Sequence, residues 1–191
     1  MKGRRIGQAF FQRNPVDCAR DLIGCYFEWD GCVGRVVETE AYAAEDDPAC
    51  HTFFRPSARR FVAGHPAGHA YIYLNYGVHW LFNVLVKDGD KDGFVLFRAL
   101  EPVAGLEVMR ARRPGCLDPG LCAGPGKLTR AMGIHGGHHA AEFLSGSGRG
   151  LWKGEGLEVG AGSRIGISRG KELPWRFCAT GSRSLSRPLP R

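Results

Sequence analysis

The sequence predicts a single mixed α/β (α+β) domain with a largely antiparallel sheet, peripheral helices and one aromatic-tipped β-hairpin. Its 191 residues suit one domain of ordinary size, which we place at residues 1–187, with a disordered tail at residues 188–191. The 28 glycines and 11 prolines predict many turns. Runs of β-branched and aromatic residues between short turn signals favour antiparallel strands.

The overall composition favours a soluble protein with a polyanionic partner. Seven cysteines form no Cys-x-x-Cys pair and follow no signal peptide, so we expect reduced thiols in the cytosol. The apolar runs are too short to span a bilayer, which argues against a membrane protein. A formal net charge of +7, spread over several basic clusters, favours association with a phosphate backbone.

The first helix and the first hairpin have clear local signals. Asn14 can cap a helix and Pro15 suits its first turn, and Gly24 can end it. The dipeptide Asp30-Gly31 is typical of a two-residue type I′ turn. Residues 25–29 and 32–40 should therefore pair as antiparallel strands.

The second of these strands ends in ionisable side chains. If it continues to Tyr42, its alternation places Glu38, Glu40 and Tyr42 on one face. An edge strand with solvated glutamates is the structural alternative. A metal-dependent phosphodiesterase is a functional alternative. Its ligands would be Glu38, Glu40, Asp46, Asp47 and His51.

The middle of the chain is predicted to form three strands after a long connection. Residues 43–69 are expected to be a long loop, of a kind that often has a function. Residues 71–86 should form a hairpin whose tip, at residues 75–78, is crowded by aromatic side chains. A third strand at residues 94–100 contains Arg98, which needs a polar or anionic partner if it is buried.

The last part of the chain is predicted to contain helices at residues 101–113 and 124–133. The second helix begins in a Gly-rich segment that could receive a phosphate. Residues 135–150, rich in Gly, His and Ser, should form a mobile surface loop. Residues 164–167 and 174–178 are expected to be two closing strands.

Three features together suggest an enzyme that acts on a base in a nucleic acid. They are a strand ending in Glu40 and Tyr42, a hairpin with Tyr76 at its tip, and a distributed basic surface. Such enzymes lift a nucleotide out of the duplex, fill the gap, and hold the base in an aromatic pocket beside a catalytic group. A tyrosine at a hairpin tip is a plausible wedge for this purpose.

Six ordered motifs resemble the alkyladenine (3-methyladenine) DNA glycosylase family, the methylpurine glycosylases, over nearly the whole chain. The first are Arg35-Val-Val-Glu-Thr-Glu-Ala-Tyr42, Asp46-Asp47-Pro-Ala-Cys-His51 and Gly68-His-Ala-Tyr71-Ile-Tyr73-Leu-Asn-Tyr76-Gly-Val-His-Trp-Leu-Phe-Asn83-Val. The others are Leu96-Phe-Arg98-Ala-Leu-Glu-Pro102, Cys122-Ala-Gly-Pro-Gly-Lys127-Leu, and Arg164-Ile-Gly-Ile167 with Pro174-Trp-Arg-Phe177. The resemblance implies a curved sheet and a hairpin that enters the minor groove of DNA.

The resemblance also implies a role for each candidate site residue. Glu40 would be the general base that activates a water, and Arg98 would order that water and Glu40. Tyr76 would be the intercalating wedge. The base pocket would consist of Tyr42, His51, Tyr73 and Asn83, with Asn83 screening the purine edge. Taken singly, His51, Tyr73, Asn83 and Arg98 could each be structural. Glu38 is expected to be structural or supporting.

The sequence departs from the family pattern between Phe53 and Pro66. Arg60 occupies the position where the family usually has Asn, and Ala63-Gly64 replace two bulky apolar residues. His79, which follows the wedge turn, either touches DNA or replaces another hairpin side chain.

The expected activity is monofunctional excision of alkylated or otherwise damaged purines from double-stranded DNA. Expected substrates are 3-methyladenine and 7-methylguanine, with hypoxanthine and ethenoadenine as further candidates. No lyase activity is expected, because no lysine lies in the site motifs, with Lys127 the nearest candidate.

No metal or organic cofactor is expected, since His135, His138 and His139 lack an accompanying ligand at metal spacing. We expect a monomer in the cytoplasm near the nucleoid, or in the nucleus of a eukaryote. A non-enzymatic binder of damaged DNA is the remaining alternative.

Overall fold

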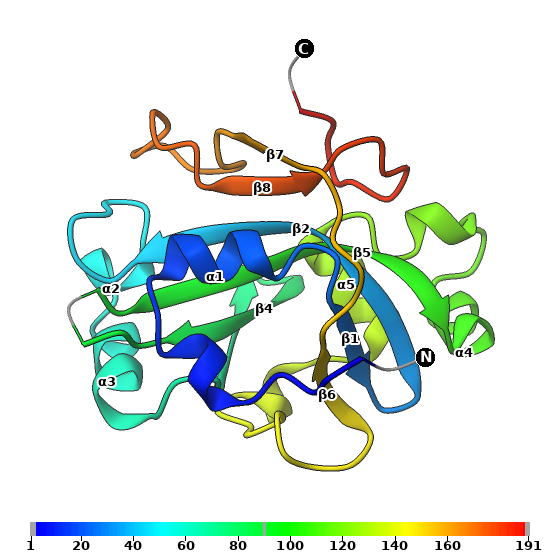
Figure 1. Cartoon of the computed structure of the whole chain (residues 1–191), viewed down its shortest axis with the longest axis horizontal. Coiled ribbons are helices and arrows are strands. Elements are labelled where there is room, and N and C mark those ends of the chain that lie inside the picture. The colour runs from blue at the N-terminus through cyan, green and yellow to red at the C-terminus, as the bar shows by residue number, and fades with distance from the viewer. Residues whose placement is uncertain (1–2, 90, 190–191) are drawn as a thin grey trace.

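Two long strands, β2 (Cys32–Ala43) and β5 (Gly93–Ala104), form the centre of the sheet (Figure 1). The computed structural model describes residues 3–89 and 91–189. The strand order is β3-β4-β5-β2-β1-β6, while β8 pairs with both β2 and β7. Every pairing is antiparallel, so the largely antiparallel mixed α/β fold is confirmed. The other strands are β1 (Tyr26–Trp29), β3 (Ala70–Asn75), β4 (His79–Val86), β6 (Arg149–Trp152), β7 (Val159–Gly162) and β8 (Arg176–Ala179).

Strand β2 changes partner halfway along one of its edges. Residues 32–35 pair with β1, and residues 38–40 pair with β8. Register shifts on either side of Glu38 mark a β-bulge in its pairing with β5. A bulge bends a strand and increases its twist, which contributes to the curvature of the sheet. Both glutamates of β2 therefore lie between neighbouring strands, and the alternative of a solvated edge strand is excluded.

Short helices surround the sheet, as expected. Figure 1 shows α2 and α3 at one end of β2 and β5, and α4 at the other. The Asn14 side chain accepts a hydrogen bond from Val16 N at 2.9 Å and so caps α1, as its sequence predicts. The helices are α1 (Pro15–Asp21), α2 (His51–Phe54), α3 (Pro56–Gly64), α4 (Leu106–Arg112) and α5 (Pro125–Met132). Single 3₁₀ turns are η1 (Gln8–Phe11), η2 (Asp118–Gly120) and η3 (Gly136–His138).

Both predicted hairpins are confirmed. Asp30 and Gly31 have φ angles of 47° and 83°, as a type I′ turn requires. At the tip of the β3–β4 hairpin, Tyr76 and Gly77 have φ angles of 50° and 71°. A positive φ is uncommon for a large aromatic residue, so the turn holds Tyr76 in a conformation its side chain does not favour.

Four local predictions are wrong. Residues 43–69 are not a long loop, because α2 and α3 lie within them. Strand β5 continues to Ala104, which delays the following helix to Leu106. Residues 164–167 form no strand. Residues 135–150 are not simply a surface loop, since Phe143 and Leu144 within them are buried.

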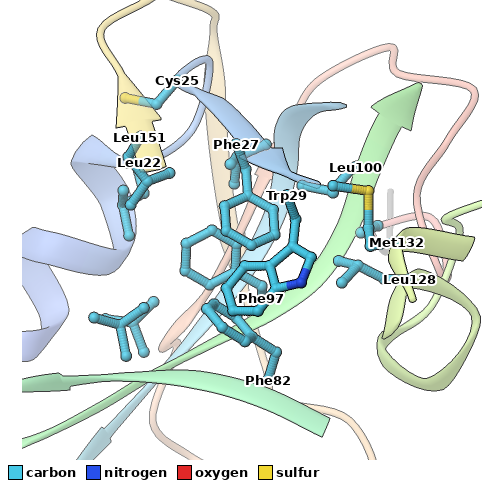
Figure 2. Close-up of a cluster of buried hydrophobic side chains, with 14 of the residues drawn as sticks. Leu22, Cys25, Phe27, Trp29, Phe82, Phe97, Leu100, Leu128, Met132 and Leu151 are labelled. Atoms are coloured by element: carbon cyan, nitrogen blue, oxygen red, sulfur yellow. The ribbon is translucent and has the colours of Figure 1, made fainter. Parts of the chain in front are cut away.

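Two apolar clusters fill the protein. The larger one has an aromatic centre in which Phe27 lies 5.1–5.9 Å from Trp29, Phe82 and Phe97, measured between ring centroids (Figure 2). The smaller one contains Phe61, Tyr71, Leu85 and Phe94 and packs against Tyr42 and Tyr73. All seven cysteines are free, and six of them are buried.

Among residues 3–89 and 91–189, no helix is long and apolar enough to cross a bilayer. Of the expected tail, Leu189 packs so closely on β7 that a Cβ at Gly160 would lie 2.5 Å from its side chain. Residues 190–191 of that tail lie outside the described residues.

Candidate functional site

Two buried glutamates of β2 share one buried arginine of β5. Arg98 Nε donates to Glu38 Oε1 at 2.8 Å, and Arg98 Nη1 lies 3.3 Å from Glu40 Oε2. Neither glutamate side chain is exposed to solvent. The expectation that Arg98 faces a polar or anionic partner is confirmed, because unpaired burial of its charge would be too costly.

Glu40 is held by donors on both carboxylate oxygens. Tyr42 Oη donates to Oε2 at 2.7 Å, and the backbone N–H of Ile165 donates to Oε1 at 2.7 Å. Burial, followed by the negative charge of Glu40, raises the pKa of Tyr42 well above its usual value. The tyrosine therefore stays protonated and remains a hydrogen-bond donor to Glu40.

Glu38 accepts more hydrogen bonds than Glu40 does. Its Oε1 accepts from Arg98, from Arg176 Nε at 2.8 Å and from Ser186 Oγ at 2.7 Å, while Oε2 accepts from Ser186 N. Burial opposes ionisation of Glu38, but Arg98, Ser186 and Arg176 outweigh it and hold its pKa below the usual value. These four hydrogen bonds support a structural role for Glu38.

A cavity of about 370 Å³ opens beside this network. Six of the seven candidate site residues line it, namely Tyr42, His51, Tyr73, Tyr76, Asn83 and Arg98. Glu40 does not line it, but lies behind Tyr42 and Arg98, to which its carboxylate is joined. The structure thus brings together residues from β2, α2, β3, β4 and β5, and the volume suits a small heterocycle.

Aromatic and amide side chains make up one wall of the cavity. The His51 and Tyr73 ring centroids are 4.2 Å apart, and His51 Nδ1 lies 3.1 Å from Tyr71 Oη. Asn83 is buried and its Nδ2 donates to the Tyr71 carbonyl at 3.1 Å. Tyr71, which sequence reasoning did not single out, therefore anchors two of the predicted pocket residues.

His51 is neutral at physiological pH. Burial, with a smaller contribution from the nearby Arg55 cation, lowers the pKa of His51 to about 4. A neutral imidazole adds no positive charge to the cavity wall, and it can both donate and accept a hydrogen bond.

This pKa predicts a pH-dependent stability. The unfolded chain binds a proton at His51 with a pKa of 6.5, while the folded protein resists protonation down to about pH 4. The free energy of unfolding should therefore fall as the pH drops from about 6.5 towards about 4, and this contribution should be constant above that range. Chemical denaturation of the wild type and His51→Gln over this range would measure it. An equal pH dependence in both proteins would contradict the assignment.

A second buried ion pair supports the rim of the cavity. Arg164 Nη1 and Nη2 donate to the two oxygens of Asp47 at 2.5 and 2.8 Å, and both side chains are fully buried. Arg164 also donates to the Ala41 carbonyl, and its guanidinium lies 4.6 Å from the Tyr42 ring centroid. It directly precedes Ile165, whose N–H binds Glu40.

This ion pair places both of its charged side chains in the interior of the protein. Their separation of 117 residues leaves no local signal that could have paired them. In the described residues, no three His, Cys, Asp or Glu side chains gather to hold a metal ion, so the ligand set of the phosphodiesterase alternative is not assembled. His135 and His138 instead form a capping box around η3, and His139 accepts from Ile72 N.

A cationic hollow adjoins the cavity. Its volume is about 880 Å³, and Asn75, Tyr76, Leu81 and Pro125 line both spaces. The hollow is also lined by His79 and by four cations, Arg112, Arg113, Lys127 and Arg130. No acidic residue lines it, and no ion pair in the described part of the chain involves these four cations.

The sequence matches one family of known proteins over most of its length. The model of the family described as Methylpurine-DNA glycosylase (MPG) matches residues 9–183. A protein of Bradyrhizobium diazoefficiens named "Putative 3-methyladenine DNA glycosylase" is 42% identical over 189 residues, covering 99% of this chain and 94% of its own. Proteins of the same name from Nitrosospira multiformis and Burkholderia cenocepacia are 42% and 41% identical, covering 94% and 99% of this chain and 92% and 94% of their own.

Proposed function

The chain belongs to the methylpurine-DNA glycosylase family, and from this we propose that it hydrolyses the N-glycosidic bond of alkylated purines in double-stranded DNA, leaving an abasic site. One observation supports this most strongly: a buried carboxyl group, 3.3 Å from the Arg98 guanidinium, lies directly behind an aromatic cavity large enough for a purine. An aromatic pocket beside a catalytic group is what an enzyme needs to act on an extruded base.

Glu40 is proposed to be the general base. A carboxylate can accept about four hydrogen bonds, and Glu40 accepts two, from Tyr42 and Ile165, while the Arg98 guanidinium lies 3.3 Å from Oε2 as an ion-pair partner. A remaining acceptor position would bind the attacking water. As the water oxygen bonds to the anomeric carbon, its proton passes to Glu40, and the purine leaves with the electron pair of the glycosidic bond. The negative charge also stabilises the positive sugar in the transition state.

The cavity walls suit a cationic purine. The faces of Tyr42 and Tyr73 would stack on an N3- or N7-alkylated base with a cation–π energy of about 1 kcal/mol or more when desolvated. His51, with its low pKa, would not repel the positive charge. Asn83 is proposed to exclude normal guanine by a clash with its exocyclic amine. A neutral lesion such as hypoxanthine or ethenoadenine needs protonation in addition.

Tyr76 is proposed to be the wedge that fills the gap in the duplex. Its side chain is 84% exposed and stands at the hairpin tip, between the cavity and the cationic hollow. The four cations of the hollow would neutralise backbone phosphates on that side.

Arg98 is proposed to hold Glu40 and the attacking water in place. The protein is proposed to act as a monomer in the cytoplasm.

Tyr76→Ser should weaken binding to a paired lesion more than binding to a lesion in an unpaired position. An unpaired base costs less to extrude, so the wedge contributes less there. Titration of both duplexes with the wild type and the variant measures the difference. An equal loss on both would mean that Tyr76 acts as a pocket wall.

The function is tested with duplexes that each contain one damaged purine. We expect alkali-dependent cleavage at the lesion, with and without EDTA, because the abasic product breaks in alkali and no metal takes part. Loss of activity in EDTA would favour the phosphodiesterase alternative. Cleavage without alkali that disappears in Lys127→Ala would show a lyase step. Tight lesion binding without any excision would leave only a binder of damaged DNA.

A further inference from the structure

Exposed apolar side chains are concentrated in α2 and in the β3–β4 hairpin, two elements that each contribute lining residues to the cavity. Eight large apolar residues are exposed in the described chain, and five of them belong to α2 or to the end of the β3–β4 hairpin. They are Phe53, Phe54, Leu74, Tyr76 and Val78. Such a concentration on a soluble protein marks an interaction surface. The proposed wedge accounts for the hairpin members, but nothing proposed so far uses the two phenylalanines.

Helix α2, which contains the two phenylalanines, is anchored to the rest of the protein by hydrogen bonds. Thr52 is buried and its Oγ1 donates to the Ala44 carbonyl at 2.7 Å, while Arg59 Nη1 donates to the Thr52 carbonyl at 2.7 Å. Phe53 and Phe54 nevertheless remain 53% and 56% exposed. Phe54 lines the cavity, whereas Phe53 does not. Phe53 therefore has a face that neither the core nor the cavity covers.

The surroundings of these rings are positively charged. No acidic residue occurs between Asp47 and Asp88, a stretch that contains both α2 and the hairpin. Arg55, Arg59 and Arg60 follow the phenylalanines, and none of them forms an ion pair in the described part of the chain. The Arg55 guanidinium lies 5.8 Å from the Phe54 ring centroid and 5.5 Å from that of Tyr73, at the cavity wall.

We propose that Phe53 and Phe54, with Arg55, Arg59 and Arg60, form a second DNA contact, here called the aromatic ledge. It stacks on a nucleobase that loses its neighbour when the damaged nucleotide is extruded. This inference rests on the proposed function. Tyr76 covers only part of the base surface that flipping exposes to water, and a second planar aromatic side chain can cover the rest, while adjacent arginines neutralise the phosphates of the same strand. The hairpin and the ledge would then contact the duplex from two separate elements beside one cavity.

The test measures the affinity of the wild type and Phe53 variants for a lesion duplex. The damaged nucleotide has a 2′-fluoro sugar, which slows loss of the base and keeps the catalytic residues unchanged. Phe53→Ala should weaken binding by about fivefold or more, because one base–aromatic stack is lost. Phe53→Tyr should retain the affinity. Leu117→Ala is the matched control, since Leu117 is 84% exposed and does not line the cavity.

Further duplexes identify the base. In each, one base is removed, either the partner of the lesion or one of its two neighbours. The effect of Phe53→Ala should disappear in the duplex that lacks the stacked base. An effect of equal size in all duplexes, or wild-type affinity of Phe53→Ala for the intact one, would overturn the aromatic ledge.

The two proposals fail in different ways. If the wild type excises alkylated purines and Phe53→Ala binds as tightly as the wild type, the ledge is rejected and the glycosylase stands. If the wild type excises nothing but Phe53→Ala still loses affinity in a base-dependent manner, the ledge stands and the catalytic proposal is rejected.

Discussion

Glu40→Gln is expected to slow excision of an alkylated purine by about 10²- to 10⁴-fold, the usual contribution of a positioned general base. The amide cannot take the proton of the attacking water. The amide also has only one acceptor oxygen. The carboxylate of the wild type has three partners, namely the donors Tyr42 Oη and Ile165 N and the guanidinium of Arg98. Single-turnover excision at saturating protein isolates this chemical step from DNA binding.

Affinity for the lesion duplex should survive in Glu40→Gln, because Glu40 lies behind the lining and does not form the cavity wall. Glu101→Gln is the control, since Glu101 is an exposed carboxylate on β5 that does not line the cavity. A wild-type excision rate in the Glu40 variant would show that another group activates the water.

Asp47→Ala is expected to lower the free energy of unfolding by about 3–5 kcal/mol, the usual effect of leaving one member of a buried ion pair without its partner. Arg164 would keep only its bonds to backbone carbonyls, and its Nε already has no hydrogen-bond partner. Chemical denaturation at neutral pH measures the loss.

The matched control is Asp21→Ala, which removes a partly exposed ion pair with Arg13. Exposed pairs contribute about 0–1 kcal/mol, so this variant should be nearly as stable as the wild type. Excision by Asp47→Ala should also fall at temperatures where the protein is folded, because Arg164 positions Ile165 against Glu40. Equal stability of the two variants would contradict the structural role of the pair.

Local signals predicted the hairpins and the helices α1 and α5, but missed α2 and α3. Asp30-Gly31 specifies its own turn, and the strands on either side need only period-two alternation. Helix α3 also had a signal, since Pro56 suits a first helical turn and the buried Ala58, Phe61 and Val62 have helical spacing. Residues 164–167 alternate like a strand, but the N–H of Ile165 bonds to Glu40 and not to a neighbouring strand.

The site residues that belong to a sequence motif could be predicted. The contacts between residues far apart in the sequence could not. The resemblance identified Tyr42, His51, Tyr73 and Asn83, and all four line one cavity. It did not pair Asp47 with Arg164, because a single sequence contains no information on which of many charges become partners after burial. The same reason explains why Arg176 and Ser186 were not linked to Glu38.

The partners of the two central glutamates have a consequence for how the protein folds. Glu38 bonds to Arg98, Arg176 and Ser186, which follow it by 60, 138 and 148 residues, and Glu40 bonds to Ile165, 125 residues away. Contacts between residues so far apart in the sequence require the closure of long loops, which costs entropy before the contacts stabilise the protein. Such contacts therefore form slowly. During synthesis, β2 leaves the ribosome long before the segments that neutralise it. The site should therefore be among the last regions to become ordered, after the hairpins that surround it.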